Sequence, residues 1–197
     1  MNYLAHLLLA EPRPHARIGA LLGDFARGLD LAALPLDARR SLLEHRAIDR
    51  FVDTHELVLA ERQRFPDRLR RFSGILLDVF YDHFLVLHWR RFCEEPLGVF
   101  THRVYAELGE HPELLSPRLS ATFPHMARDD WLGSYGDEAN VQRALEGMAR
   151  RLRRPTPLAE GIQQLRERRP ELEAHFLELF PAVVSFVARR RLETNGE

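Results

Sequence analysis

Apolar residues recur every three to four positions along nearly the whole chain, whereas no segment sustains the strict alternation that marks a half-buried strand. Helices are therefore the expected elements, and prolines divide them. The expected helices cover residues 2–10, 17–29, 37–64, 67–93, 97–109, a short stretch between 112 and 124, 136–153, 158–168 and 171–192. Pro181 lies inside the last of these and predicts a kink or a break there.

The helix pattern also predicts the domain organisation. No low-complexity linker and no repeat of fixed period interrupts the chain. We therefore predict an all-α protein, a single-domain helical bundle of seven to nine helices over residues 1–197, with a polar tail from about residue 193.

The composition is that of a globular protein, because hydrophobic residues make up 45% and charged residues 29% of the 197 residues. The net charge of −1 lacks the strong basic balance of most nucleic-acid-binding proteins, so no nucleic-acid partner is expected. No apolar stretch reaches the roughly 20 residues that a membrane span needs, and the N-terminal segment lacks the basic region of a signal peptide. We expect a cytoplasmic protein without a membrane partner, and the single Cys93 excludes an intrachain disulfide framework.

Arginine supplies all 28 basic residues of the chain. Codon bias in a GC-rich genome would produce this composition without any functional cause. A surface that binds phosphate or carboxylate groups would also produce it, because arginine grips such groups with two parallel hydrogen bonds. Composition alone leaves both explanations open.

The segment GILLDVFYDHFLVLHW, residues 74–89, is apolar on all sides and yet carries two aspartates. A helix of this pattern belongs in a protein core. Asp78 and Asp82 lie one helical turn apart, so both carboxylates share one face and need a positive partner. Asp–Arg ion pairs would supply it; a divalent metal is favoured because His83 follows directly and adds an imidazole ligand. His88 is expected to be an ordinary core histidine.

A second helix, with the sequence EHRAIDRFVDTH at residues 44–55, shows the same combination of acids and histidines. The spacing places His45, Asp49 and Asp53 along one edge of the helix, beside its apolar stripe. Pairing of the acids with Arg46 and Arg50 on the same helix is the alternative interpretation. Because two helices carry such stepped acids and histidines, we favour a metal site between helices.

Two further residues are weaker candidates by themselves. His6 lies within the apolar stretch LAHLLL, and Asp24 lies within LLGDFARG. A buried core histidine and an ordinary turn aspartate are the alternative interpretations of these two positions.

Four stretches together resemble the acyl carrier protein phosphodiesterases, also called acyl carrier protein hydrolases: MNYLAHLLLA, LLGDFARG, HRAIDRFVDTH and RRFSGILLDVFYDHFLVLHW. DWLGSYG at 130–136 and RRLRRPTPLAEG at 150–161 extend the resemblance along nearly the whole chain. This family is similar to the HD-type metal-dependent phosphohydrolases, so the resemblance implies an HD-like architecture. It also implies an enzyme that hydrolyses the 4′-phosphopantetheine group from holo-acyl carrier protein and leaves the apo protein.

The resemblance further implies a divalent metal, with Mn²⁺ the expected ion and Mg²⁺, Fe²⁺ or Co²⁺ possible. The metal ligands that it implies are drawn from His6, Asp24, His45, Asp49, Asp53, Asp78, Asp82 and His83. For catalysis we expect His45 or His83 to protonate the leaving serine oxygen, and Arg46 or Arg27 to bind the non-bridging phosphoryl oxygens.

Acyl carrier proteins are acidic along the helix that begins at the modified serine, so the resemblance implies an acidic protein partner. The turn around Pro66 is rich in arginine and would attract it. The expected partner-binding residues are Arg27, Arg62, Arg64, Arg70 and Arg71. An ordinary solvated turn is the alternative interpretation.

Two other functions remain open on the sequence. The first is an HD-like phosphohydrolase that acts on a nucleotide or a small phosphodiester, which would need the metal ligands but not the arginine-rich turn. The second is a non-enzymatic helical module with buried Asp–Arg ion pairs that binds an acidic partner. Metal content distinguishes the second alternative from both enzymes.

Overall fold

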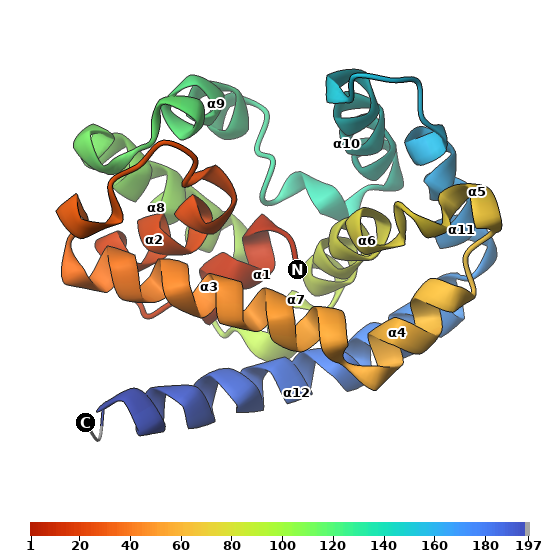
Figure 1. The fold of residues 1–197 in the computed structure, drawn as a ribbon, viewed down its shortest axis with the longest axis horizontal. Coiled ribbons are helices and arrows are strands. Elements are labelled where there is room, and N and C mark those ends of the chain that lie inside the picture. Colours follow the sequence, from red (N-terminus) through yellow and green to blue (C-terminus); the bar gives the residue numbers. More distant parts are fainter. Residues whose placement is uncertain (196–197) are drawn as a thin grey trace. The chain divides into compact units, whose positions relative to one another are not determined.

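The computed structural model describes residues 1–195, and every regular element in them is a helix (Figure 1). The predicted all-α fold class is therefore confirmed. The described chain contains twelve α-helices, α1–α12, and four short 3₁₀-helices, η1–η4. The HD-like architecture stays a prediction.

The chain divides into two compact units. The α2 unit comprises Tyr3–Ala47 and His88–Ser134, and the α6 unit comprises Met1–Asn2, Ile48–Leu87 and the chain from Tyr135 onward. Each unit is described by itself, and the prediction of a single domain stays a prediction. One helix, α3, is continuous across the boundary between Ala47 and Ile48.

The α2 unit is built around one buried helix. Its elements are α1 (Tyr3–Leu9), α2 (Pro14–Phe25), η1 (Leu31–Ala33), most of α3 (Leu36–Thr54), α7 (Trp89–Phe92), α8 (Leu97–Glu110), η2 (Pro112–Leu114) and α9 (Pro117–Arg128). Pro14 occupies the first turn of α2, where its fixed φ angle favours helix and no amide hydrogen is needed. Helix α2 packs against α1, α8 and α9.

Two glycines on α2 allow α3 to approach it closely. A Cβ atom on Gly19 would overlap the main-chain oxygen of Ala38, and one on Gly23 would overlap the imidazole ring of His45. Gly19 and Gly23 lie one turn apart, so they form one groove along α2. This close approach places His45 directly against α2.

The α6 unit has an aromatic core. Besides the end of α3 it contains α4 (Glu56–Gln63), α5 (Asp67–Arg70), α6 (Ser73–Leu87), nearly all of η3 (Ser134–Gly136), α10 (Glu138–Arg151), η4 (Pro157–Gly161), α11 (Ile162–Glu167) and α12 (Arg169–Asn195). Helix α6 packs against α10 and α12. Phe84 and Phe176 are fully buried, with ring centroids 6.1 Å apart. Burial of each such side chain contributes about 1.5–3 kcal/mol to stability.

Two predicted helices are divided in the structure, which explains why twelve helices replace the seven to nine expected. The segment 37–64 breaks at His55, whose backbone is extended and whose Nδ1 accepts a hydrogen bond from the amide of Leu57 at 3.3 Å. The imidazole thus caps α4 and compensates for the interrupted helix. The segment 67–93 breaks before Ser73 and again at His88, giving α5, α6 and α7.

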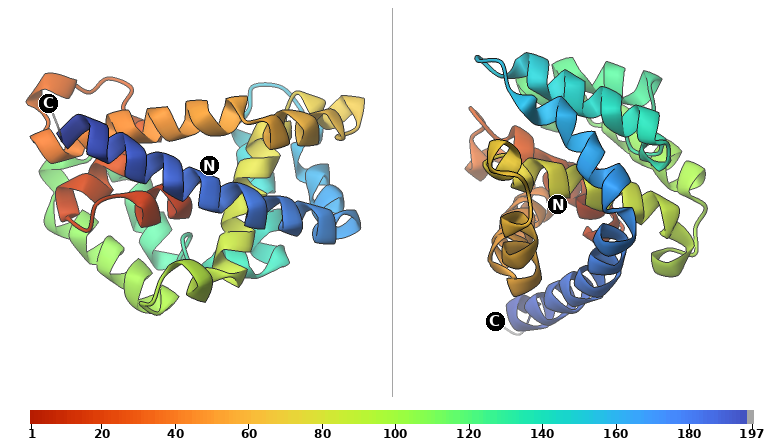
Figure 2. Two further views of the ribbon diagram at one scale, coloured as in Figure 1. Left: turned by 90° about the horizontal axis from the view of Figure 1, so that it is seen from below. Right: turned by 90° about the vertical axis from the view of Figure 1, so that its right-hand side faces the viewer.

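Helix α12 runs through Pro181 without a break, so the break considered for that position is wrong, whereas the kink stays a prediction (Figure 2). It also extends to Asn195, so the polar tail expected from about residue 193 begins inside the helix. Residues 196–197 of that tail lie outside the described residues. None of the described helices combines the length and apolar character needed to cross a membrane.

Candidate metal centre

Two buried histidines from different helices lie face to face. His6 belongs to α1 and His45 to α3, and their ring centroids are 3.6 Å apart with the planes inclined by only 16°. Both side chains are almost completely inaccessible to solvent. Burial of two imidazoles at this separation requires that their nitrogens bind other groups, because unsatisfied buried polar atoms are costly.

The orientation of His45 is fixed by a main-chain hydrogen bond. Its Nδ1 donates to the carbonyl oxygen of Ala20 at 2.6 Å, so Nε2 is the nitrogen that can accept a proton or bind a metal. Oδ1 of Asp24 lies 3.9 Å from that Nε2. A histidine anchored through one nitrogen and directed with the other towards an acid is the arrangement found in metal sites.

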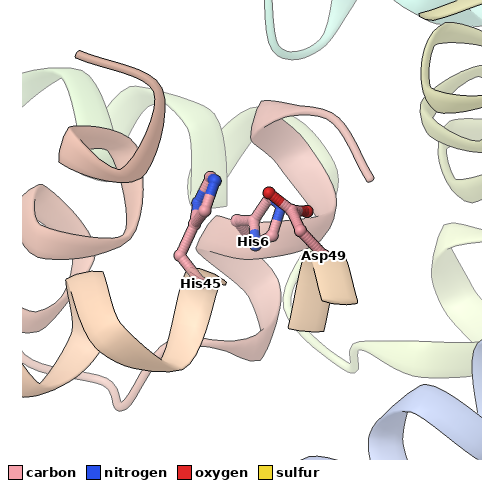
Figure 3. A group of neighbouring side chains, drawn as sticks. All are labelled: His6, His45 and Asp49. Carbon is pink, nitrogen blue, oxygen red and sulfur yellow. The ribbon is translucent and has the colours of Figure 1, made fainter. Parts of the chain in front are cut away.

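Asp49 completes a cluster of three possible ligands. It lies one turn after His45 on the continuous helix α3, and each of His6, His45 and Asp49 offers a donor atom within 4.8 Å of the other two. Figure 3 shows the His6 side chain from α1 and the His45 and Asp49 side chains from α3 converging. Ligands bound to one ion at roughly 2.0–2.2 Å lie up to roughly 4.4 Å apart, so small side-chain adjustments would bring all three onto one ion.

A second acidic group, within the α6 unit, surrounds the α-amino group of Met1. This nitrogen lies 2.7 Å from Oδ1 of Asp78 and 3.5 Å from Oδ1 of Asp49. Burial disfavours the charged amine, but the carboxylates of Asp78 and Asp49 outweigh burial and raise its pKa to about 10. Asp82, which is buried, adds to this effect. Asp49 thus shares the Met1 amine with the aspartates of α6.

The surroundings of Asp78 disfavour the charged form of its carboxyl group, whereas those of Met1 favour the charged amine. The protein atoms packed around it raise its pKa, although 40% of its side chain stays exposed, and the Met1 ammonium group opposes that shift. At Asp78 the positive partner is therefore the Met1 amine, and among residues 1–195 no arginine or histidine forms an ion pair with this carboxylate.

The structure places two other predicted ligands in different surroundings. Asp53 lies one turn after Asp49, is 65% exposed on its side chain and accepts a hydrogen bond from Arg62 at 3.3 Å. His83 is buried, and its Nδ1 donates to the carbonyl oxygen of Tyr135 at 2.6 Å. Burial lowers the pKa of His83, which keeps the ring neutral near pH 7.

The arginines expected to bind substrate or partner differ in their pairing. Arg46 and Arg27 are exposed, and within residues 1–195 neither forms an ion pair. Arg71 stacks on the ring of Phe72, with its guanidinium carbon 4.6 Å from the ring centroid. The remaining three each contact a carboxylate: Arg62 with Asp53 at 3.3 Å, Arg64 with Glu61 at 3.4 Å and Arg70 with Asp67 at 2.8 Å.

Three contributors to this region were not identified from the sequence. The main-chain carbonyls of Ala20 and Tyr135 anchor the two histidines, and the Met1 amine binds the acids. Tyr135 and Met1 carried a signal, because they belong to the DWLGSYG and MNYLAHLLLA stretches that contributed to the family resemblance. Main-chain groups have no letter in a sequence, so the contacts that these groups make could not have been found.

The described chain is all-helical, and His6, His45 and Asp49 form a group that could hold a metal ion, an arrangement that helical proteins use for metal sites. Residues 1–183 match the family model described as acyl carrier protein phosphodiesterase, and the chain belongs to this family. The relatives below carry the same description.

The protein named acyl carrier protein phosphodiesterase from Photorhabdus laumondii is 32% identical over 182 residues, which are 92% of this chain and 92% of that protein. The protein of that name from Salmonella agona is 33% identical over 193 residues, which are 98% of this chain and 100% of its own length. The protein of that name from Enterobacter sp. strain 638 is 32% identical over 193 residues, which are 98% of this chain and 100% of its own length. No solved structure matches the chain.

Proposed function

We propose that this protein is a metal-dependent phosphodiesterase that hydrolyses 4′-phosphopantetheine from holo-acyl carrier protein, in the cytoplasm and as part of fatty acid metabolism. Its membership of the acyl carrier protein phosphodiesterase family supports the reaction. The single structural observation that carries the metal dependence is the convergence of donor atoms from His6, His45 and Asp49.

The donor set suits a transition metal. Two imidazoles and one carboxylate are ligands that Mn²⁺, Fe²⁺, Co²⁺ and Zn²⁺ accept, whereas Mg²⁺ prefers oxygen ligands and water. Mn²⁺ is the ion that we propose, with His6, His45 and Asp49 as its ligands and Asp24 beside His45. A divalent cation held there supplies a Lewis acid that polarises a phosphoryl oxygen and lowers the pKa of a water molecule.

The aspartates of α6 extend the acidic region. Asp78 and Asp82 act on the Met1 amine together with Asp49, so they lie within electrostatic reach of the proposed ligands. We assign them to the site as groups that either orient Asp49 or hold a second ion. Asp53 points towards Arg62 instead, and we place it outside the ligand set.

The reaction requires that protons move between water and the leaving oxygen. Water forms the new bond to phosphorus, the bond from phosphorus to the serine oxygen breaks, and the serine oxygen gains a proton. Because His45 belongs to the ligand set, we give this proton transfer to His83, whose Nδ1 is engaged and whose Nε2 carries a lone pair. A neutral His83 accepts a proton from water first and returns it to the serine oxygen.

Arg46 follows His45 on α3 and is exposed, so its guanidinium group is available for the phosphoryl oxygens, whose charge increases in the transition state. Arg27, at the end of α2, is a second candidate for the same task. On the sequence pattern we also propose contacts between the acidic carrier protein and Arg62, Arg64, Arg70 and Arg71, which lie around the Pro66 turn.

The test is a comparison of substrates with and without metal. Purified protein is analysed for bound metal, treated with a chelator, resupplied with Mn²⁺ and incubated with holo-acyl carrier protein, and mass spectrometry follows loss of the phosphopantetheine group. We expect stoichiometric metal, no activity after chelation and recovery with Mn²⁺.

Two other results would replace the proposal. Hydrolysis of nucleotides or bis(4-nitrophenyl) phosphate without any hydrolysis of holo-acyl carrier protein would identify a phosphohydrolase for small substrates. Binding of the carrier protein without metal and without hydrolysis would identify a helical binding module.

A further inference from the structure

Four arginines lie within five residues at the end of α10, at positions 150, 151, 153 and 154. Arg150 and Arg151 belong to the last turn of α10, where positive charge complements the helix dipole. Arg153 and Arg154 follow the C-cap residue Leu152 and are exposed outside the helix. Helix stabilisation therefore explains the first two arginines and leaves the second two unexplained.

This segment has little negative charge near it. No Asp or Glu occurs in the sequence between Glu146 and Glu160. Glu146 lies 4.0 Å from Arg150, and within residues 1–195 no carboxylate is at ion-pair distance from Arg153 or Arg154. Adjacent like charges without counter-charge repel each other and do not favour folding. Such a surface is typical of one that meets an oppositely charged partner.

The Pro66 turn, in the same unit, is different because most of its arginines are neutralised by neighbouring acids. The pairs are Arg62 with Asp53, Arg64 with Glu61, Arg68 with Glu160 and Arg70 with Asp67. An acidic partner would have to compete with these carboxylates for each guanidinium group. Of the two arginine-rich segments, the one after α10 thus presents the less compensated positive charge.

Leu152 adds an apolar contact at the centre of the same segment. It is 41% exposed and is flanked on each side by two arginines. An apolar side chain with a charged rim is the usual arrangement of a protein-binding surface. We infer that the segment Arg150–Arg154 is the principal docking surface for the acidic helix of the carrier protein, an inference that rests on the function proposed above.

The experiment reverses the charge of the two unpaired arginines in the full chain. Arg153→Glu/Arg154→Glu should raise the KM for holo-acyl carrier protein roughly tenfold with little change in kcat, since the contacts act on encounter and binding. The increase should shrink as ionic strength rises from about 0.05 M to about 0.5 M, because salt screens exposed charges. Hydrolysis of bis(4-nitrophenyl) phosphate should stay at the wild-type rate.

The matched control is Arg90→Glu/Arg91→Glu, which reverses two adjacent exposed arginines on α7 and changes the net charge equally. It should leave the KM for the carrier protein within about twofold of the wild type. Equal KM values for the two double variants, or equal losses on both substrates, would overturn the docking surface while leaving the proposed function intact. A wild-type protein that does not hydrolyse holo-acyl carrier protein would instead overturn the proposed function, and the docking surface with it.

Discussion

His45 on α3 and His83 on α6 are held in the same way and meet different surroundings. Each imidazole is buried, and each donates from Nδ1 to a main-chain carbonyl oxygen at 2.6 Å, that of Ala20 for His45 and that of Tyr135 for His83. At Nε2 the two differ. Asp24 lies 3.9 Å from Nε2 of His45, whereas within residues 1–195 no hydrogen-bond partner reaches Nε2 of His83.

The comparison shows that anchoring and function are separate properties of a buried histidine. The carbonyl fixes the tautomer and the ring orientation in both cases. What the free nitrogen does depends on the groups that other helices bring to it. For His45 these are a second imidazole and two carboxylates, which suit a cation; for His83 burial is the largest influence and lowers its pKa.

The largest effect expected from this comparison concerns two aspartates on one helix. Asp49→Asn should reduce hydrolysis of holo-acyl carrier protein at least roughly a hundredfold, the loss that follows even when an indirect partner of a metal ligand is removed. Asp53→Asn makes the same carboxylate-to-amide change one turn further along α3, where the side chain is exposed and paired with Arg62. It should reduce the rate of hydrolysis less than about threefold. Activity and bound metal are measured for both variants.

The outcome separates the two positions directly. Equal losses for Asp49→Asn and Asp53→Asn would show that the ligand set extends along the whole edge of α3, as the sequence spacing alone suggests. Full metal content in Asp49→Asn would remove this residue from the ligands.

A smaller effect is expected for the second histidine, and it should appear in stability and activity without loss of metal. His83→Ala leaves the carbonyl of Tyr135 without its donor in a buried position, which costs about 1–3 kcal/mol of unfolding free energy. Bound metal should stay at the wild-type amount, whereas His45→Ala should lose it. Urea unfolding and metal analysis of both variants provide the measurement, and loss of metal from His83→Ala would contradict the distinction drawn here.

Much of the fold could be predicted from the sequence because helical periodicity and proline positions are local signals. The break at His55 could not, since it depends on an imidazole that caps the next helix. His45 and Asp49 could be paired because they share a helix. That His6 joins them depends on where α1 lies, and no spacing within one helix contains that information.

The separation of Asp49 from Asp53 was also beyond the sequence. Both fit the same helical row, and only the structure shows that Asp53 is exposed and paired with Arg62. In α6 the sequence indicated a positive partner for Asp78 and Asp82, with arginines or a metal as the candidates. The Met1 amine that contacts Asp78 was missed because it belongs to the main chain.

The smallest effect tests how dry the core is around Tyr81, on the same helix as His83. Tyr81 lies two residues before His83 on α6, is fully buried, and its hydroxyl lies 2.9 Å from Nδ1 of His175. Burial strongly raises the pKa of Tyr81, so the folded protein keeps the phenolic proton above pH 10 while the unfolded chain loses it. The unfolded state then binds fewer protons, and stability must fall as the pH rises above about 10.

At pH 11 this single group should cost the wild type about 1.4 kcal/mol of unfolding free energy relative to pH 9. Tyr81→Phe loses the contact with His175 at every pH, which costs about 1 kcal/mol, but it should lack this added decline. The informative quantity is therefore the difference between the two slopes of stability against pH, obtained from urea unfolding at several pH values. Parallel slopes would mean that water reaches Tyr81 in the folded protein.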